Sequence, residues 1–181
     1  MHLAVNLGGI PHLVKNQRDV GHPRSTGKVE FLESATLASS MPVSQTTIRV
    51  RYAETDQMGI VYYANFFIWF EVGRVELLRQ LGFHYKQMEI DDDCHIPVVE
   101  ANCRYKSPAR YDDELLLETR VLAIRRSVLK FGYRLLRPEN EGTTLLAEGE
   151  TVHVTVDRSF RPVRLPQKYV AVLGQFLVAP S

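Results

Sequence analysis

From residue 41 onward, the apolar residues first follow the alternating pattern of a strand and then the pattern of a helix. Residues 46–51 alternate apolar and polar positions and are rich in β-branched side chains, which predicts a strand. Residues 65–81 are apolar on nearly every side of a helical projection, which predicts one long helix that ends at Gly82. A helix that is apolar all round is unstable on a surface, so we expect it to be enclosed.

The remainder of the chain reads mainly as strands. Residues 83–93 predict a short helical turn and an acidic loop. Residues 161–165 are a candidate edge extension, and residues 167–177 are a candidate C-terminal helix. Between these lie four predicted strands, separated by short polar turns: 95–106, 114–124, 128–137 and 144–157. One helix followed by a run of strands indicates the α+β class with an antiparallel sheet.

The first 40 residues have a different character. Glycine and proline punctuate them and neither hydrophobic period persists. We expect residues 1–40 to be a disordered extension or to follow a start site placed too early, and residues 41–181 to form one domain. An extra element that packs on the fold remains the alternative. The extension lacks the basic region and long apolar stretch of a signal peptide.

Composition excludes several classes of function. The net charge is +1, which gives no electrostatic case for binding nucleic acid or a membrane surface. Cys94 and Cys103 are too few for a disulfide framework, and we expect both to fill space in a reducing, cytoplasmic setting. The histidines lack the spacing of metal ligands, so no metal site is predicted. Serine-hydrolase and nucleotide-binding glycine motifs are also missing from the sequence.

The segment 50–67 is the most informative part of the chain. A strand-like run ends at the lone carboxylate Asp56, a glycine turns the chain, and tyrosines and an asparagine open the predicted helix. Taken by spacing alone, Asp56 is more readily a turn residue that bonds its own backbone. The tyrosines read equally well as packing residues, and Asn65 reads as an N-cap or turn residue.

The order of residues from Asp56 to Phe66 resembles the active-site stretch of hotdog-fold acyl-CoA thioesterases of the 4-hydroxybenzoyl-CoA thioesterase type. The matching positions are Asp56, Gly59, Ile60, Val61, Tyr62, Asn65 and Phe66. The resemblance spans most of residues 44–170. It implies an antiparallel sheet wrapped around one long buried helix. It also implies that Asp56 acts as nucleophile or general base, and that the backbone N–H of Tyr63 polarises the thioester carbonyl.

Other positions take their roles from the same resemblance. Arg125 and Arg126 stand at a turn between strands where the family places basic residues that hold CoA phosphates, and Tyr62 is a substrate-contact candidate. From the residues alone, the doublet reads equally well as a solvated turn. Gly59 and Asn65 are expected to support the loop. Glu71 is expected to pair with Arg74 inside the helix, as a structural or interface feature or as a carboxylate near a partner's site.

The function implied is hydrolysis of an acyl-CoA thioester to a free acid and CoA. No cofactor is expected, because CoA is part of the substrate. The acyl group, and acyl carrier protein in place of CoA, stay open. A bacterial subgroup that acts on short acyl thioesters has histidine at the position of Tyr63, which argues against that subgroup's substrates.

Two rival functions remain. One is a hotdog dehydratase or hydratase, which would use a histidine that residues 56–65 lack. The other is a non-catalytic hotdog protein that binds acyl-CoA. In each case an open sheet edge must be covered, so we expect a homodimer with a continuous sheet, or a dimer of dimers.

Overall fold

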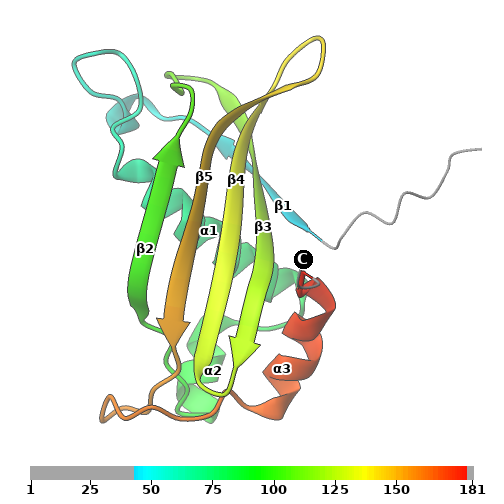
Figure 1. The fold of residues 1–181 in the computed structure, drawn as a ribbon. Coiled ribbons are helices and arrows are strands. Elements are labelled where there is room, and N and C mark those ends of the chain that lie inside the picture. Colours follow the sequence, from blue (N-terminus) through cyan, green and yellow to red (C-terminus); the bar gives the residue numbers. More distant parts are fainter. Residues whose placement is uncertain (1–42, 179–181) are drawn as a thin grey trace, which may run out of the picture. The chain divides into compact units, whose positions relative to one another are not determined.

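Five antiparallel strands form one sheet, and a single long helix packs on one of its faces (Figure 1). The computed structural model describes residues 43–178, so the extension predicted at residues 1–40 lies outside them. The α+β class is confirmed. The elements in chain order are β1 (Ser44–Arg49), η1 (Tyr52–Glu54), α1 (Asn65–Gln80), α2 (Tyr85–Asp91), β2 (Val98–Tyr105), β3 (Glu114–Arg125), β4 (Val128–Pro138), β5 (Thr143–Val154), α3 (Gln167–Leu173) and η2 (Gly174–Phe176).

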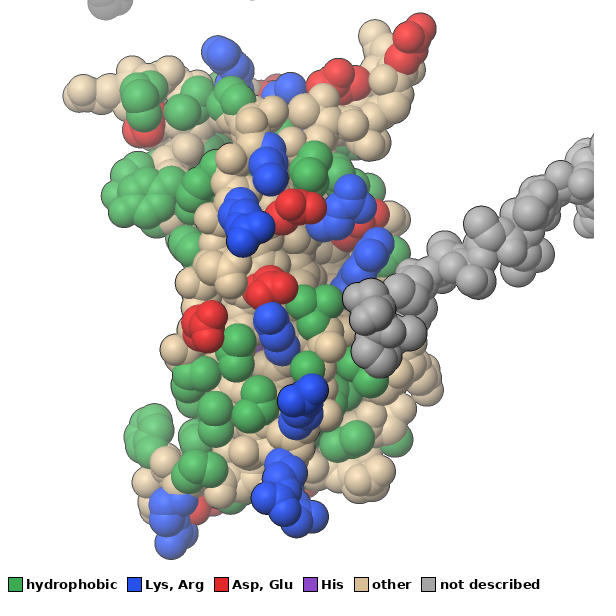
Figure 2. Space-filling view, in the orientation of Figure 1, with side chains coloured by type: hydrophobic (Ala, Val, Ile, Leu, Met, Phe, Trp, Pro, Cys, Tyr) green, Lys and Arg blue, Asp and Glu red, His purple; other side chains and the backbone are tan. Residues whose placement is uncertain are grey.

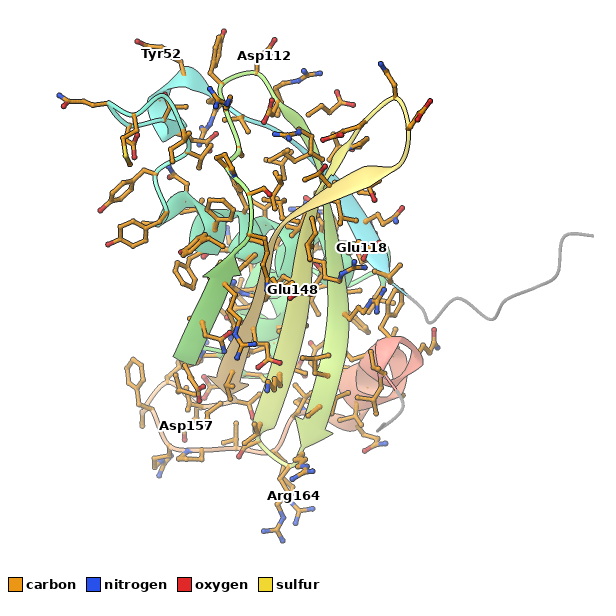
Figure 3. All side chains as sticks on the ribbon, turned by 45° about the horizontal axis from the view of Figure 1, so that its top comes forward. Tyr52, Asp112, Glu118, Glu148, Asp157 and Arg164 are labelled. Atoms are coloured by element: carbon orange, nitrogen blue, oxygen red, sulfur yellow. The ribbon has the colours of Figure 1, made fainter. Side chains whose placement is uncertain are left out.

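The strands lie in the order β1-β3-β4-β5-β2, so β1 and β2 form the two edges. Strands β3, β4 and β5 are joined by short turns and occupy the centre. The face of the sheet turned away from α1 is polar, as a solvated face of an antiparallel sheet should be. One row of opposed residues crosses it with alternating charge: Glu118, Arg134, Glu148 and Arg104 (Figures 2 and 3).

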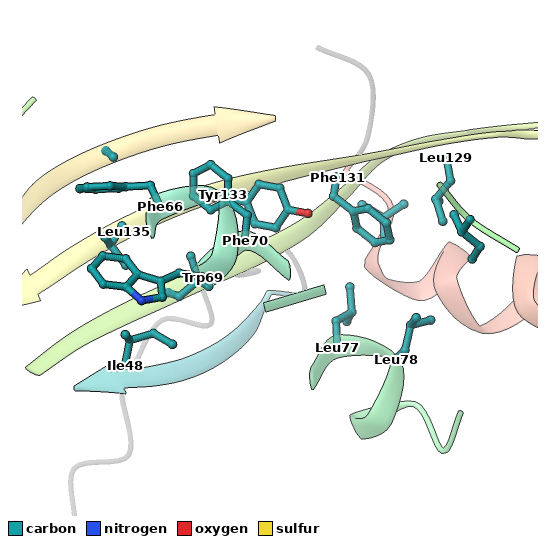
Figure 4. Packing of buried hydrophobic residues seen from close by; sticks show 14 of the residues in the cluster. Ile48, Phe66, Trp69, Phe70, Leu77, Leu78, Leu129, Phe131, Tyr133 and Leu135 are labelled. Atoms are coloured by element: carbon teal, nitrogen blue, oxygen red, sulfur yellow. The ribbon is translucent and has the colours of Figure 1, made fainter. Parts of the chain in front are cut away.

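Helix α1 approaches the sheet closely because two glycines leave room. A Cβ on Gly73 would lie 2.5 Å from the Thr119 hydroxyl oxygen, and one on Gly149 would lie 2.4 Å from the Phe70 ring. Phe70 in turn stacks on Tyr133 with ring centroids 4.3 Å apart. Aromatic and aliphatic side chains fill the space between the layers; Figure 4 labels Ile48, Phe66, Trp69, Phe70, Leu77, Leu78, Leu129, Phe131, Tyr133 and Leu135.

The end of α1 follows the prediction. Gly82 has a φ of +80°, its N–H donates to Arg79, and the Phe83 N–H donates to the Leu78 carbonyl at 2.9 Å. This pair of bonds is a Schellman motif, which favours glycine at that position. The predicted C-terminal helix is also present, as α3 followed by η2.

Three sequence predictions need correction. Helix α1 is not enclosed within one chain, because the sheet covers only one of its faces and Ile68 on the opposite face is 53% exposed. Residues 161–165 form no strand, only an isolated bridge between Val156 and Pro162. The first strand ends at Arg49, because the chain turns into η1 after Val50 donates its N–H to Asp113.

The two cysteines are free thiols, as expected. Cys94 is buried in the core and Cys103 packs against it. Burial raises the pKa of the Cys94 thiol to about 11, which makes it a poor nucleophile. Within residues 43–178, none of the helices has both the length and the apolar character needed to cross a membrane.

Candidate active site

Residues 55–61 form a small closed loop that leads into α1. An antiparallel bridge joins Thr55 to Val61, and the Asp56 N–H donates to the Ile60 carbonyl at 2.9 Å. Gly59 donates its N–H to the Asp56 carbonyl at 2.9 Å and has a φ of +71°. Because this conformation favours glycine, the supporting role predicted for Gly59 has a structural basis.

Within the described chain, only one of the two Asp56 side-chain oxygens accepts a hydrogen bond. Oδ1 accepts the Met58 N–H at 2.8 Å, which is the turn-forming bond that spacing alone suggested. Among residues 43–178, Oδ2 has no hydrogen-bond donor. The carboxylate is therefore held in orientation by one oxygen and offers the other to a ligand.

Two tyrosines follow the loop and remain accessible. Tyr62 is 46% exposed and Tyr63 is 56% exposed, with ring centroids 4.6 Å apart. The neighbouring Tyr63 phenol raises the pKa of Tyr62, and the Asp56 carboxylate raises it further.

The start of α1 supplies an unoccupied backbone donor. Within the described part of the chain, the Tyr63 N–H makes no hydrogen bond. This N–H precedes the first turn of the helix, where the helix dipole favours negative charge. Ala64 is the N-cap, so the alternative of Asn65 as N-cap is wrong. Asn65 instead reaches back and donates Nδ2 to the Glu54 carbonyl at 2.8 Å.

Glu54 is a buried carboxylate that the sequence analysis did not single out. Its side chain accepts the Arg51 N–H at 2.7 Å, the Arg51 guanidinium at 2.8 Å and the Trp69 indole N–H at 3.1 Å. Burial acts to raise the pKa of Glu54, but these hydrogen bonds together outweigh it and lower the pKa below its ordinary value. The bond from the Arg51 N–H to Glu54 is one half of a capping box around η1. The other half is missing, because arginine has no side-chain acceptor and the Glu54 N–H donates to the Arg51 carbonyl instead.

A pocket of about 370 Å³ opens beside Tyr63. Its two sides are tied together because Val61 donates its N–H to Ala109 at 2.9 Å and Tyr105 donates its hydroxyl to the Tyr63 carbonyl at 3.1 Å. Burial raises the pKa of Tyr105 to about 12, so this hydroxyl stays protonated as a donor. The lining is mostly apolar and contains no histidine: Ile60, Val61, Tyr63, Phe66, Tyr105, Lys106, Ser107, Pro108 and Ala109.

The arginine doublet lies at the opposite end of the sheet. The loop of Asp56 adjoins the start of β3, where Arg49 pairs with Glu114, whereas Arg125 ends that strand. At ~3.4 Å per residue, β3 separates these ends by roughly 37 Å. The structure therefore does not bring the doublet and Asp56 together within one chain.

A third arginine, Arg164, forms an arginine cluster with Arg125 and Arg126, and Figure 3 labels Arg164 at that end of the molecule. Leu165 donates its N–H to the Arg126 carbonyl at 3.0 Å, which places Arg164 next to the β3–β4 turn. Arg164 is exposed. Because 37 residues lie between Arg126 and Arg164 in the sequence, no local motif could have revealed the grouping.

Glu71 forms the predicted pair but in a different setting. Its carboxylate lies 3.3 Å from the Arg74 guanidinium. The Glu71 side chain is 66% exposed whereas that of Arg74 is 13% exposed, so the expectation of a buried pair holds for Arg74 only. Across residues 43–178, no group of three or more His, Cys, Asp or Glu side chains is arranged to hold a metal ion.

Known proteins resemble this chain in sequence and fold. The family model described as the thioesterase-like superfamily matches residues 50–173, which include the loop, α1 and all strands except β1. The chain belongs to the thioesterase-like superfamily. The match also covers Arg125, Arg126 and Arg164.

Similar proteins and solved structures are also named as thioesterases. The chain is 39% identical to the putative acyl-CoA thioesterase YneP of Bacillus subtilis, over 71% of this chain and 91% of that protein. It is 31% identical to the DHNA-CoA thioesterase of Staphylococcus aureus, with a TM-score of 0.66, over 74% of this chain and 88% of that one. A 4-hydroxybenzoyl-CoA thioesterase mutant in complex with its thioester shares the fold, with a TM-score of 0.68 at 20% identity, over 72% of this chain and 98% of that one. The predicted hotdog fold is confirmed.

Proposed function

We propose that this chain hydrolyses acyl-CoA thioesters to a free acid and CoA, with Asp56 as nucleophile or general base. One observation carries the proposal. A single segment beside an apolar pocket contains both an Asp56 oxygen without a donor and a Tyr63 N–H without an acceptor. The names of the relatives support the same class of substrate.

The chemistry needs few groups because a thiolate leaves readily. In one route the Asp56 carboxylate attacks the thioester carbonyl carbon, the C–S bond breaks, and water hydrolyses the resulting anhydride. In the other route Asp56 takes a proton from a water molecule as the water oxygen attacks the carbonyl carbon. The C–S bond of the tetrahedral intermediate then breaks, and the departing CoA thiolate takes up the proton. In both, negative charge develops on the carbonyl oxygen, and the Tyr63 N–H together with the helix dipole stabilises it.

A hydratase or dehydratase is less well supported. That chemistry would use a histidine beside the reacting carbon, and no histidine lines the pocket near Tyr63. His153, a buried histidine, is committed to the Ile96 carbonyl and the Thr151 hydroxyl. A purely binding function would not use the Asp56 oxygen that has no donor in the described chain.

Dimerisation would bring the two halves of the site together. Strand β2 pairs only with β5, so in the described chain its other edge is open, and Val99 on it is 58% exposed. If two β2 edges pair antiparallel about a two-fold axis, the end at Tyr105 meets the partner's end at Val98. The partner's arginine cluster then lies on the same side as Asp56, three to four strands away from β2, or roughly 14–20 Å across the sheet.

This arrangement suits a long substrate. The acyl group would occupy the apolar pocket, and the nucleotide phosphates would reach Arg125, Arg126 and Arg164 of the partner subunit. Arginine favours phosphate because its planar fork donates two hydrogen bonds at once. Acyl carrier protein carries the same phosphopantetheine arm, so it is the alternative carrier.

Thiol release from a thioester panel tests the proposal. The panel should contain aromatic, short aliphatic and long aliphatic acyl groups on CoA, and the same acyl groups on acyl carrier protein. We expect turnover of at least one member with release of free thiol. Binding without turnover, or hydration of an enoyl-CoA without thiol release, would contradict it.

A further inference from the structure

We propose that Glu54 is a positioning residue that holds Asp56 and the Tyr63 N–H in register by joining the loop to helix α1. The inference rests on the proposed thioesterase function and adds a residue to its site. Glu54 is only 4% exposed, so its carboxylate does not face a substrate and its burial needs another explanation.

The contacts of Glu54 reach both parts of the catalytic segment. Its side chain holds the backbone of Arg51 on one side and the Trp69 indole in α1 on the other. Its carbonyl accepts the Tyr62 N–H at 2.9 Å and the Asn65 amide at 2.8 Å. One residue thus fixes the chain two positions before Asp56 and on both sides of Tyr63.

The charge of Glu54 is used by this arrangement. All three groups that face the carboxylate are donors, and two of them belong to Arg51. An amide in the same place would present an NH₂ group to at least one donor and leave it unsatisfied. Replacement of the carboxylate should therefore loosen the loop without emptying any volume.

A loosened loop affects turnover more than binding. Transition-state stabilisation depends on the position of the Tyr63 N–H relative to the attacking group, and small displacements lower the rate strongly. Under the proposed function, substrate affinity comes mainly from the pocket and the arginine cluster, and the Glu54 carboxylate bonds to neither. The expected signature is a lower kcat with an unchanged KM.

The test compares Glu54→Gln with Glu54→Asp and Trp69→Phe in the full-length protein. We expect Glu54→Gln to lower kcat about tenfold or more while KM for the CoA thioester stays within about twofold. Glu54→Asp keeps the charge and should recover part of kcat. Trp69→Phe removes the indole donor together with part of the buried indole volume, and it should give a smaller loss of kcat because both Arg51 donors stay paired with Glu54. Amide hydrogen exchange should be faster at Tyr62 in each variant.

Two comparisons separate the possible causes. Tyr133→Phe removes a buried hydrogen bond of 2.8 Å to Thr151 and reports the effect of lost stability alone. Asp56→Asn reports the proposed function. If Asp56→Asn turns over normally, the proposed function fails. If Asp56→Asn is inactive but folded Glu54→Gln and Trp69→Phe retain wild-type kcat, or lose activity only as much as Tyr133→Phe, the positioning role is wrong.

Discussion

At the scale of single residues, Asp56 meets two requirements with one side chain. Oδ1 closes the turn through Met58, while Oδ2 has no donor in the described chain. The turn interpretation and the catalytic interpretation, which the sequence presents as alternatives, are compatible. The resemblance to thioesterases was needed to choose Asp56, because a turn aspartate looks the same in a sequence.

Other residues of the site were not predictable in this way. Glu54 reads as an ordinary polar residue, since its burial depends on Trp69 of α1. Arg164 and Tyr105 reach the site regions through contacts between distant segments. Local motifs identify residues that act within their own segment. They miss residues that the fold brings to the site from distant parts of the chain.

The arginine cluster gives a prediction at this scale. Arg125→Ala combined with Arg126→Ala should raise KM for a CoA thioester more than it lowers kcat, because contacts far from the carbonyl contribute uniform binding. Each charge-assisted contact is worth roughly 1.5–3 kcal/mol if well formed, and less where solvent screens it. Steady-state kinetics measures both constants.

A truncated thioester without the nucleotide is the control for this variant. The double variant should treat it like the wild type, and adding Arg164→Ala should raise KM for the CoA thioester further. Equal loss with both substrates would assign the doublet a role in the fold.

At the scale of elements, the strands and the long helix were largely predictable, and the environment of the helix was not. Because α1 is apolar on nearly every side, its sequence does not show which face meets the sheet. The structure resolves this through Gly73, where a Cβ would lie 2.5 Å from the Thr119 hydroxyl and 2.7 Å from Leu117. The sheet contacts that face only, so Ile68 on the opposite face stays exposed in a single chain.

Substitution of Gly73 separates helix propensity from packing. Alanine favours a helix over glycine by about 1 kcal/mol. In α1 the close contacts to β3 should reverse this, so Gly73→Ala should lower the free energy of unfolding by about 1–3 kcal/mol. Gly174→Ala, with no atom within 4 Å of its added Cβ, is the matched control. Chemical denaturation measures both, and a stabilised Gly73→Ala would contradict the packing.

The core between β5 and β4 contains a titrating group. The pKa of His153 is lowered to about 4, mainly by burial and in smaller part by the charge of Arg74, which together outweigh the hydrogen bond to Ile96. The unfolded chain takes up this proton near pH 6.5 whereas the folded chain does not. The resulting stability is fully present above about pH 6.5 and is lost as the pH falls toward 4, by about 3 kcal/mol in total.

Thermal unfolding between pH 7.5 and 5.5 checks this dependence. The melting temperature should fall through that range, above the region where carboxylates with lowered pKa values, such as Glu54 and Asp92, begin to protonate. His153→Gln removes the titration and should flatten the slope, although it starts from lower stability. An equally steep slope in that variant would assign the effect to other groups.

At the scale of the whole molecule, the order of the strands could not be read from the sequence. Local turns predict that β3, β4 and β5 are neighbours, but nothing in residues 95–106 indicates that β2 pairs with β5 and leaves an edge open. The sequence did predict that an open edge must be covered. The distance between Asp56 and the arginine cluster gives that expectation a functional reason.

Blocking this edge should remove activity without unfolding the chain. Val99 lies at a register shift between Val98 and Glu100, where β2 and β5 are not paired. Val99→Lys places a charge on the open edge, which disfavours strand pairing, and Val99→Thr is the matched control. We expect monomers by light scattering and loss of CoA-thioester turnover for Val99→Lys only. A fully active monomer would show that each chain holds a complete site.

The central claim is that the Asp56 carboxylate carries the reaction, and Asp56→Asn tests it most directly. The amide keeps the shape of the side chain and its Oδ1 acceptor for the Met58 N–H, so folding and CoA affinity should stay near wild type. Thiol release from the best substrate should fall by orders of magnitude in kcat. A folded Asp56→Asn variant with wild-type kcat would contradict the account.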